Sequence, residues 1–398
     1  MTVLELSRLQ FAVVTIYHYL FVPLSISLAA LTAGLQTAWW RTGDDRYRRQ
    51  TLLVGKLLMA TFAVGVVTGL VQEFQFGLSW SEFARFYGDV FGPTLAIEGM
   101  LAFFLEATFL GLWWFGWDRL GPRLHLATIW VVAVGTLISA YVILAANAFM
   151  QHPVAYTLDP ATGRARLGSF TELLTNEVVL AAFPHTIAGA FAGGGALLLA
   201  VGAWRCWRNG LDPDGGRLLA RVGAWTTLVS GTAVALTGDV LGKVMTSVQP
   251  MKMAAAEALY ATQTPAPFSV FAIGTPGAHE PWFTLDIPGL LSFLGTGSFA
   301  GTVQGIDDLQ AQYAAQFGPG DYVPWIPVAY WTFRLMIGFG VLATAVAAWV
   351  LWRTRRGRDL RPAGGGVGGL ADRWLLRGLW AVPLLPAAAG TEIGRAHV

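Results

Sequence analysis

Long apolar runs set the first limit on what this chain can fold into. Hydrophobic residues make up 55% of the 398 residues and charged residues 13%, against about 25% charged residues in a typical soluble domain. A helix needs roughly 20 mostly apolar residues to cross a bilayer. We therefore predict an all-α, polytopic transmembrane helix bundle of about eight spans, near residues 12–38, 52–72, 94–116, 126–148, 179–204, 218–241, 327–352 and 374–390, the last of them short.

The Lys and Arg residues predict the orientation of the bundle. They gather in the connections after the first, third, fifth and seventh spans, for example at residues 41–49 and 353–361. Because positive charge concentrates in cytoplasmic loops, the N-terminus and the polar segment 243–324 are expected outside. Glu5 and Arg8 lead directly into a full-length span, without the small-residue cleavage site of a secretory signal.

Charge and cysteine content exclude several classes of function. The formal net charge of +2 is too small to indicate a nucleic-acid-binding protein. A lone Cys206 cannot form an intrachain disulfide, a cysteine-rich metal site or the C-x-x-C-H attachment of a c-type haem. Any cofactor must therefore be held without thioether bonds.

Three side chains that can ligate iron lie inside predicted spans at a similar depth. They are His18 in "YHYLFVP", His185 in "FPHTIAG" and Met336 in "FRLMIG", and the helix rise places all three in the outer half of the bilayer. Imidazole and thioether are axial donors for haem iron. The alternatives are a hydrogen bond from each histidine to a neighbouring helix and a core position for the methionine, but scattered core residues would not share a depth.

Two carboxyl groups lie inside the third span, in "IEGMLAFFLEA". Glu98 and Glu106 are eight residues apart, or about 12 Å along a helix, so they can form successive steps of a proton route. Lys56 and Asp118 would lie at its cytoplasmic mouth. The alternative is that both glutamates are protonated and only hydrogen-bonded, and the two interpretations are compatible because a relay also needs carboxyls with raised pKa values.

Longer motifs carry a resemblance to a known family. The stretches "ELSRLQFAVVTIYHYLFVPLS", "GLVQEFQFGLSWSEFARFYGDVFGPTLAIEGMLAFFLEATFLGLWWFGWDRLG", "ANAFMQHPVA", "FPHTIAG", "TGD" and "FRLMIG" resemble subunit I of the cytochrome bd ubiquinol or menaquinol oxidases. The resemblance implies a complex in the bacterial inner membrane that oxidises quinol and reduces O2 to water without pumping protons. It also implies a low-spin haem b558, high-spin haems b595 and d, a partner subunit II and a small accessory subunit.

The resemblance assigns roles by matching motif. His18 resembles the axial ligand of a high-spin haem, and His185 with Met336 resembles the b558 pair. The other matched residues are Arg334 for the haem propionates, Glu98 and Glu106 beside the high-spin haems, and Lys252 and Glu257 at the quinol headgroup in "VQPMKMAAAEALYATQ". The polar segment is similar to that of the short-loop members, which leaves ubiquinol and menaquinol open.

The C-terminus departs from the family pattern. The family continues through "TE-x-GRQPW" into a ninth helix, whereas this sequence ends in "TEIGRAHV". Glu392 and Arg395 are either the family's haem-binding residues in a shortened helix or part of a non-native tail, because "EIGRAHV" also matches one reading frame of a sequencing adaptor. The second interpretation predicts that the eighth span is truncated and the ninth is missing.

We divide the chain into residues 1–242 with six spans, the haem ligands and the carboxyls, residues 243–325 as the extracytoplasmic quinol-binding segment, and residues 326–398 with the last spans. Two other functions are compatible with parts of the sequence. A haem b membrane electron carrier would need His185 and Met336 but not His18 or the acidic third span. A proton-coupled transporter would use the glutamates and need no iron.

Overall fold

The computed structural model describes residues 2–207, 213–274 and 280–355. Within them, seven helical segments are long and apolar enough to cross a membrane, which confirms the predicted polytopic helix bundle. The helices of these segments are α1 (Val3–Tyr19), α2 (Val22–Thr42), α3 (Asp45–Leu78), α4 (Ser81–Gly99), π-helix η1 (Met100–Glu106), α5 (Ala107–Phe115), α6 (Pro122–Gln151), α8 (Glu177–Trp207), α9 (Pro213–Val248) and α13 (Ile326–Arg353). The predicted eighth span, 374–390, lies outside the described residues, as do Glu392 and Arg395.

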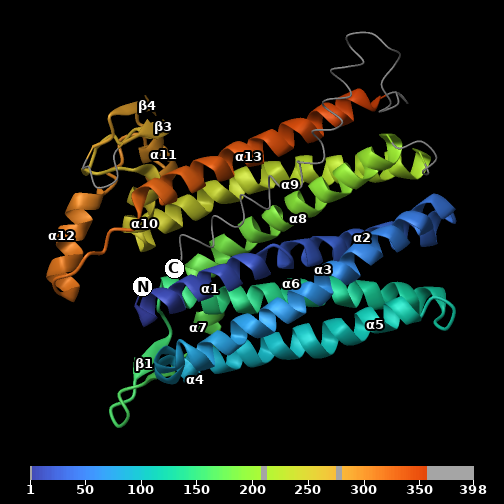
Figure 1. The fold of residues 1–398 in the computed structure, drawn as a ribbon, viewed down its shortest axis with the longest axis horizontal. Helices are drawn as coiled ribbons and strands as arrows, with labels where there is room; N and C mark the ends of the chain where they lie inside the picture. The colour runs from blue at the N-terminus through green and yellow to red at the C-terminus, as the bar shows by residue number, and fades with distance from the viewer. Residues whose placement is uncertain (1, 208–212, 275–279, 356–398) are drawn as a thin grey trace.

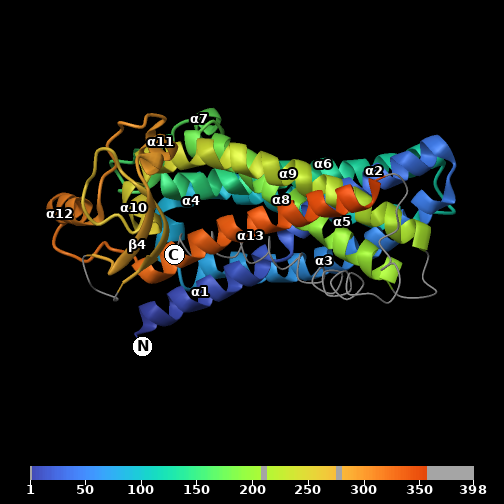
Figure 2. The same cartoon turned by 90° about the horizontal axis from the view of Figure 1, so that it is seen from above.

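Successive spans run in opposite directions along the bundle. Figure 1 shows the long helices side by side, with the α2–α3 and α5–α6 connections at one end and the N-terminus at the other. The smaller elements α10, α12 and β4 also gather at the N-terminal end (Figure 2). The basic connections and the polar segment therefore lie at opposite ends, as the positive-inside pattern requires.

Short helices and two hairpins form the layer at the N-terminal end. They are β1 (Tyr156–Leu158), β2 (Ala165–Leu167), α7 (Phe170–Leu174), α10 (Pro250–Glu257), β3 (Phe268–Ile273), β4 (Phe283–Ile287), α11 (Leu290–Thr296) and α12 (Ile306–Phe317). Each hairpin is antiparallel, β1 with β2 and β3 with β4. Helix α9 continues through Lys243 to Val248, six residues beyond the predicted boundary at 242.

Small residues let α8 and α9 approach closely. A Cβ atom added to Gly223 of α9 would lie 2.3 Å from the backbone nitrogen of Leu199 on α8, and one added to Gly202 would lie 2.3 Å from that of Ala220. Backbone atoms cannot move aside as a side chain can. Glycine at these positions is therefore what permits this helix pair, as is common between membrane helices.

Three departures from regular α-helix lie beside predicted functional residues. The first span is interrupted at Leu20 and Phe21, just before Pro23 and directly after the turn that carries His18. The third span changes to the π-helix η1 between Glu98 and Glu106. Pro184 precedes His185 within α8; because proline has no N–H, it removes one hydrogen bond of that helix. Such interruptions are frequent at functional sites, as π-helical turns show.

Candidate functional site

His18 packs between α1 and α3. Its Nδ1 atom lies 3.0 Å from the hydroxyl oxygen of Thr68 on α3. The next residue is Gly69, where an added Cβ atom would come within 2.9 Å of the imidazole Cε1. The half-buried ring therefore packs against Gly69, and any larger residue at this position would collide with it.

His185 has the same surroundings on a different helix pair. Its Nδ1 atom lies 3.3 Å from the hydroxyl oxygen of Thr237 on α9, and a Cβ atom added to Gly238 would lie 3.1 Å from its Cε1. Met336 is on α13, which packs against α9 as α8 does. Figure 1 shows these three helices next to one another. The structure thus brings the helices of both predicted b558 ligands onto α9.

Glu98 and Glu106 both reach α6. The Ser139 hydroxyl donates to Glu98 Oε1 at 3.4 Å. Glu106 is 6% exposed, and an added Cβ atom on Gly135 would lie 3.4 Å from its Cγ. Since Gly135 and Ser139 are four residues apart, they share one face of α6. The two carboxyl groups therefore border the same helix face.

Glu257 forms a buried ion pair with Arg334. The Arg334 Nη2 atom lies 2.5 Å from Glu257 Oε2, and its Nη1 atom lies 3.2 Å from Oε1. The Arg334 side chain is 8% exposed and that of Glu257 is 2% exposed. Arg334 also donates from Nε to the Ser269 carbonyl at 2.6 Å, and its guanidinium lies 4.3 Å from the ring centre of Phe268 and 4.6 Å from that of Tyr330. The predicted quinol segment is therefore joined to α13 two residues before Met336.

Burial changes the proton affinity of both predicted quinol residues on α10. It raises the pKa of Glu257 to about 7, because loss of water outweighs the opposing effect of Arg334. Burial also lowers the pKa of Lys252 to about 8. The two side chains are five residues apart on one helix, so they project about 140° apart around its axis. Both can exchange a proton near neutral pH.

The predicted mouth of the proton route is at the far end of the bundle. Lys56 is exposed on α3, and Asp118 is exposed in the turn after α5. Within the described residues, neither side chain forms a hydrogen bond or an ion pair with Glu106. The structure therefore groups the carboxyls of the third span but leaves these two residues apart from them.

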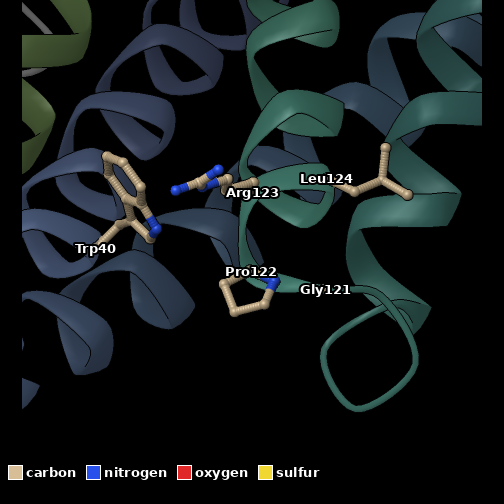
Figure 3. A pocket seen from close by; sticks show the side chains of 5 residues that line it. All are labelled: Trp40, Gly121, Pro122, Arg123 and Leu124. Atoms are coloured by element: carbon tan, nitrogen blue, oxygen red, sulfur yellow. The ribbon is translucent and has the colours of Figure 1, made fainter.

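Two cavities of the described residues lie away from His18 and His185. One, of about 530 Å³, is lined by Trp40 and residues 121–124 near the start of α6 (Figure 3). A second, of about 340 Å³, is lined in part by Gln36 and His125. Neither includes a predicted haem or quinol residue.

Sequence reasoning missed four polar residues around the predicted site. They are Thr68 and Thr237 beside the histidines, Ser139 on α6, and Glu73 of α3, which is near enough to Glu98 to interact with its charge. The repeated dipeptide Thr-Gly, at 68–69 and 237–238, is the signal that could have indicated the first two. Nothing comparable marks Ser139 or Glu73.

Comparisons with known proteins agree with the motifs. The family model described as cytochrome bd terminal oxidase subunit I matches residues 6–395. The chain is 40% identical to cytochrome bd ubiquinol oxidase subunit 1 of Bacillus subtilis (strain 168), over 99% of this chain and 83% of that protein. It is 34% identical to cytochrome bd-II ubiquinol oxidase subunit 1 of Escherichia coli (strain K12), over 99% of this chain and 87% of that protein.

A solved structure has the same fold. The bd oxidase from Geobacillus thermodenitrificans superposes with a TM-score of 0.86 at 27% identity, over 99% of this chain and 86% of that one. The family match spans nearly the whole sequence and the fold agrees over the same length. The chain therefore belongs to the cytochrome bd terminal oxidase subunit I family.

Proposed function

We propose that this chain is the haem-bearing subunit of a quinol:oxygen oxidoreductase. We also propose that the motif residues have the roles predicted for them from the sequence. Membership of the family makes it part of a terminal quinol oxidase. In our proposal His185 and Met336 hold haem b558, and His18 ligates one of the two high-spin haems, b595 or d. Arg334 contributes positive charge for the propionates.

The observation that carries this proposal is the matching environment of the two histidines. Histidine that ligates a metal almost always donates its other ring N–H to a nearby acceptor, and Nδ1 of both His18 and His185 faces a threonine oxygen. The donor set also fits, since His/Met is an axial pair of low-spin haem. Bound haem would supply one-electron transfer and, at the high-spin pair, an open iron position for O2.

Lys252 and Glu257 suit the work of a quinol site. An ammonium group can donate a hydrogen bond to a quinol oxygen, and a carboxylate can accept the proton that leaves as the quinol is oxidised. A base works best when its pKa is close to the working pH, and that of Glu257 is about 7. We propose ubiquinol or menaquinol as the substrate, bound in the segment 243–325, with the haem ligands in 1–242 and 326–398.

The carboxyls of the third span support proton delivery from the other side. We propose a route past Lys56 and Asp118 to Glu106 and Glu98, with the N-terminus outside. Protons from quinol leave outward, and those that form water enter from the cytoplasm. This separation would generate proton-motive force without a pump, in a bacterial inner membrane and in complex with subunit II and a small accessory subunit.

Spectra of the assembled complex test this function. The reduced-minus-oxidised spectrum should show bands of a low-spin b haem and of a chlorin-type haem d. His18→Ala should remove or displace one high-spin haem and keep the low-spin band, whereas His185→Ala should do the reverse.

Three outcomes would contradict the proposal. If a folded, complete complex contained no haem, the function would be wrong. If it contained only the low-spin haem and consumed no O2, the chain would be an electron carrier. If His18→Ala removed the low-spin band instead, the ligand assignment would be reversed.

A further inference from the structure

The threonines beside the two histidines are themselves fixed by their own helices. The Thr68 hydroxyl donates to the carbonyl of Val64 at 2.9 Å, and the Thr237 hydroxyl donates to the carbonyl of Ala233 at 2.7 Å. A hydroxyl has a single proton to donate. Once that proton is directed at the helix carbonyl, the oxygen can only accept a hydrogen bond from the histidine.

The direction of these bonds determines which ring nitrogen carries the proton. Because each threonine oxygen accepts, Nδ1 must be the protonated nitrogen, and the lone pair of the neutral ring is then on Nε2. A backbone carbonyl of the same helix turn also interacts with each ring, that of Gly65 with His18 and that of Val234 with His185. Both rings thus meet the same set of acceptors at corresponding positions.

A third histidine within a span shows the opposite arrangement. Trp113 Nε1 donates to Gln36 Oε1 at 2.6 Å, so the Gln36 amide nitrogen must donate to Nδ1 of His125 at 2.8 Å. Nε2 of His125 then donates to the Trp113 carbonyl at 2.8 Å. Both nitrogens of His125 are used within the protein, and its proton is on Nε2. The arrangement at His18 and His185 is therefore not what packing between these helices produces everywhere.

We propose that Thr68 and Thr237 are positioning residues that hold His18 and His185 in the Nδ1–H tautomer and so present Nε2 to haem iron. This inference rests on the proposed function, because it assumes that the two histidines are iron ligands. A hydrogen bond accepted from Nδ1–H makes the imidazole a stronger electron donor. Each threonine should therefore stabilise the ferric form of its haem.

The test at His185 is the midpoint potential of the low-spin haem in the complete complex. Thr237→Val keeps the shape and removes the acceptor, so ferric haem should lose stability and the potential should rise. A tenfold change in the ferric-to-ferrous equilibrium corresponds to about 59 mV for one electron, and we expect a shift of up to that size. Thr237→Ser keeps the hydroxyl and should restore the original value.

Thr232→Val is the matched control on the same helix. Thr232 is exposed, and its hydroxyl donates to its own helix at the Leu228 carbonyl, as Thr237 does at Ala233. It faces no histidine in the described residues. A shift in Thr237→Val that is absent from Thr232→Val would therefore come from the lost contact with His185.

The test at His18 is the iron–histidine stretching frequency of the reduced high-spin haem, measured by resonance Raman spectroscopy. This frequency should fall in Thr68→Val, because a weaker donor binds iron less strongly. Thr61→Val on the same helix, whose hydroxyl bonds only to the Leu58 carbonyl in the described residues, should leave it unchanged.

Each outcome decides the proposal. It is overturned if the valine variants match their controls in potential and frequency, or if Thr237→Val and Thr237→Ser lose haem equally, since the hydroxyl would then be irrelevant. It is supported if only the valine variants shift or lose haem. If His185→Ala keeps the low-spin haem, the ligand assignment itself is wrong. If His185→Ala loses that haem but Thr237→Val and Thr232→Val have the same midpoint potential, only the role of the hydroxyl is wrong.

Discussion

Replacing Glu257 by glutamine should remove the acid side of the pH dependence of quinol oxidation. If the Glu257 carboxylate accepts the quinol proton, the rate follows its ionised fraction. With a pKa of about 7, that fraction is about one half at pH 7, about one tenth at pH 6 and about one hundredth at pH 5, so the rate should fall about fivefold from pH 7 to pH 6 and about tenfold from pH 6 to pH 5.

The size of the expected rate loss follows from the proposed role of Glu257 as a general base. A positioned general base contributes about 10²- to 10⁴-fold, so quinol-driven O2 consumption by Glu257→Gln at pH 7.5 should fall by about 100-fold or more. Its residual rate should not depend on pH between 5 and 7. On the alkaline side, wild-type activity should decline as Lys252, whose pKa is about 8, loses the proton that it donates to the quinol oxygen. The wild-type profile is therefore bell-shaped, with its maximum between pH 7 and 8.

The structure also suggests the necessary controls. Removing one partner of a buried ion pair costs about 3–5 kcal/mol in stability, and Glu257→Gln leaves Arg334 without its counter-charge. Arg334 keeps its bond to the Ser269 carbonyl, and the amide can still accept one hydrogen bond. Haem bands and oxidation of an artificial donor that bypasses the segment must therefore be measured alongside, with Glu280→Gln, an exposed carboxylate of the same segment, as the matched control.

Two results would contradict the proposed role of Glu257 as the quinol base. One is undiminished quinol turnover in Glu257→Gln at normal haem content. The other is an acid limb that persists unchanged in this variant, because the titrating group would then be elsewhere.

Three further variants test other parts of the structure. Gly223→Ala should reduce the yield and thermal stability of the complex, because its Cβ atom would collide with backbone of α8 and overpacking costs about 1–3 kcal/mol; Gly189→Ala, with nothing within 4 Å of its Cβ position, should not. Glu106→Gln should slow O2 consumption with quinol and with an artificial donor alike, since proton delivery serves both. Rates equal to those of the wild-type complex in an oxygen electrode would contradict the proposed route. Gln36→Leu should lower the melting temperature, because it leaves Nδ1 of His125 buried without its hydrogen bond at a cost of about 1–3 kcal/mol; an unchanged melting curve would show that this network does not stabilise the fold.

The ion pair between α10 and α13 joins the proposed quinol segment to the helix that carries the proposed haem ligand Met336. Glu257 is on α10, and its partner Arg334 is on α13 two residues before Met336. A change of charge on Glu257 as it takes up a proton is therefore felt directly by the residue proposed for the haem propionates. If Glu257 is the quinol base and Arg334 binds the haem propionates, as proposed, this ion pair links quinol deprotonation to electron transfer.

Local composition and short motifs were enough to predict the helix bundle and the family. The length of an apolar run decides whether a helix can span a bilayer, and the position of basic residues decides which ends lie together, so both can be derived from local composition. The seven described spans and the separation of the two ends agree with that derivation. The motifs around His18, His185, Glu98 and Met336 were likewise sufficient to indicate the family.

Contacts between side chains of different helices could not be predicted in this way. Arg334 and Glu257 are 77 residues apart, His18 and Thr68 are 50 apart, and His185 and Thr237 are 52 apart. These contacts depend on how each helix is rotated about its axis and which neighbour it packs against, and hydropathy along one chain contains neither quantity. The π-helix η1 (Met100–Glu106) is a further example, because a local widening of the helix has no distinct residue pattern, yet it changes the angle between Glu98 and Glu106 around the helix axis.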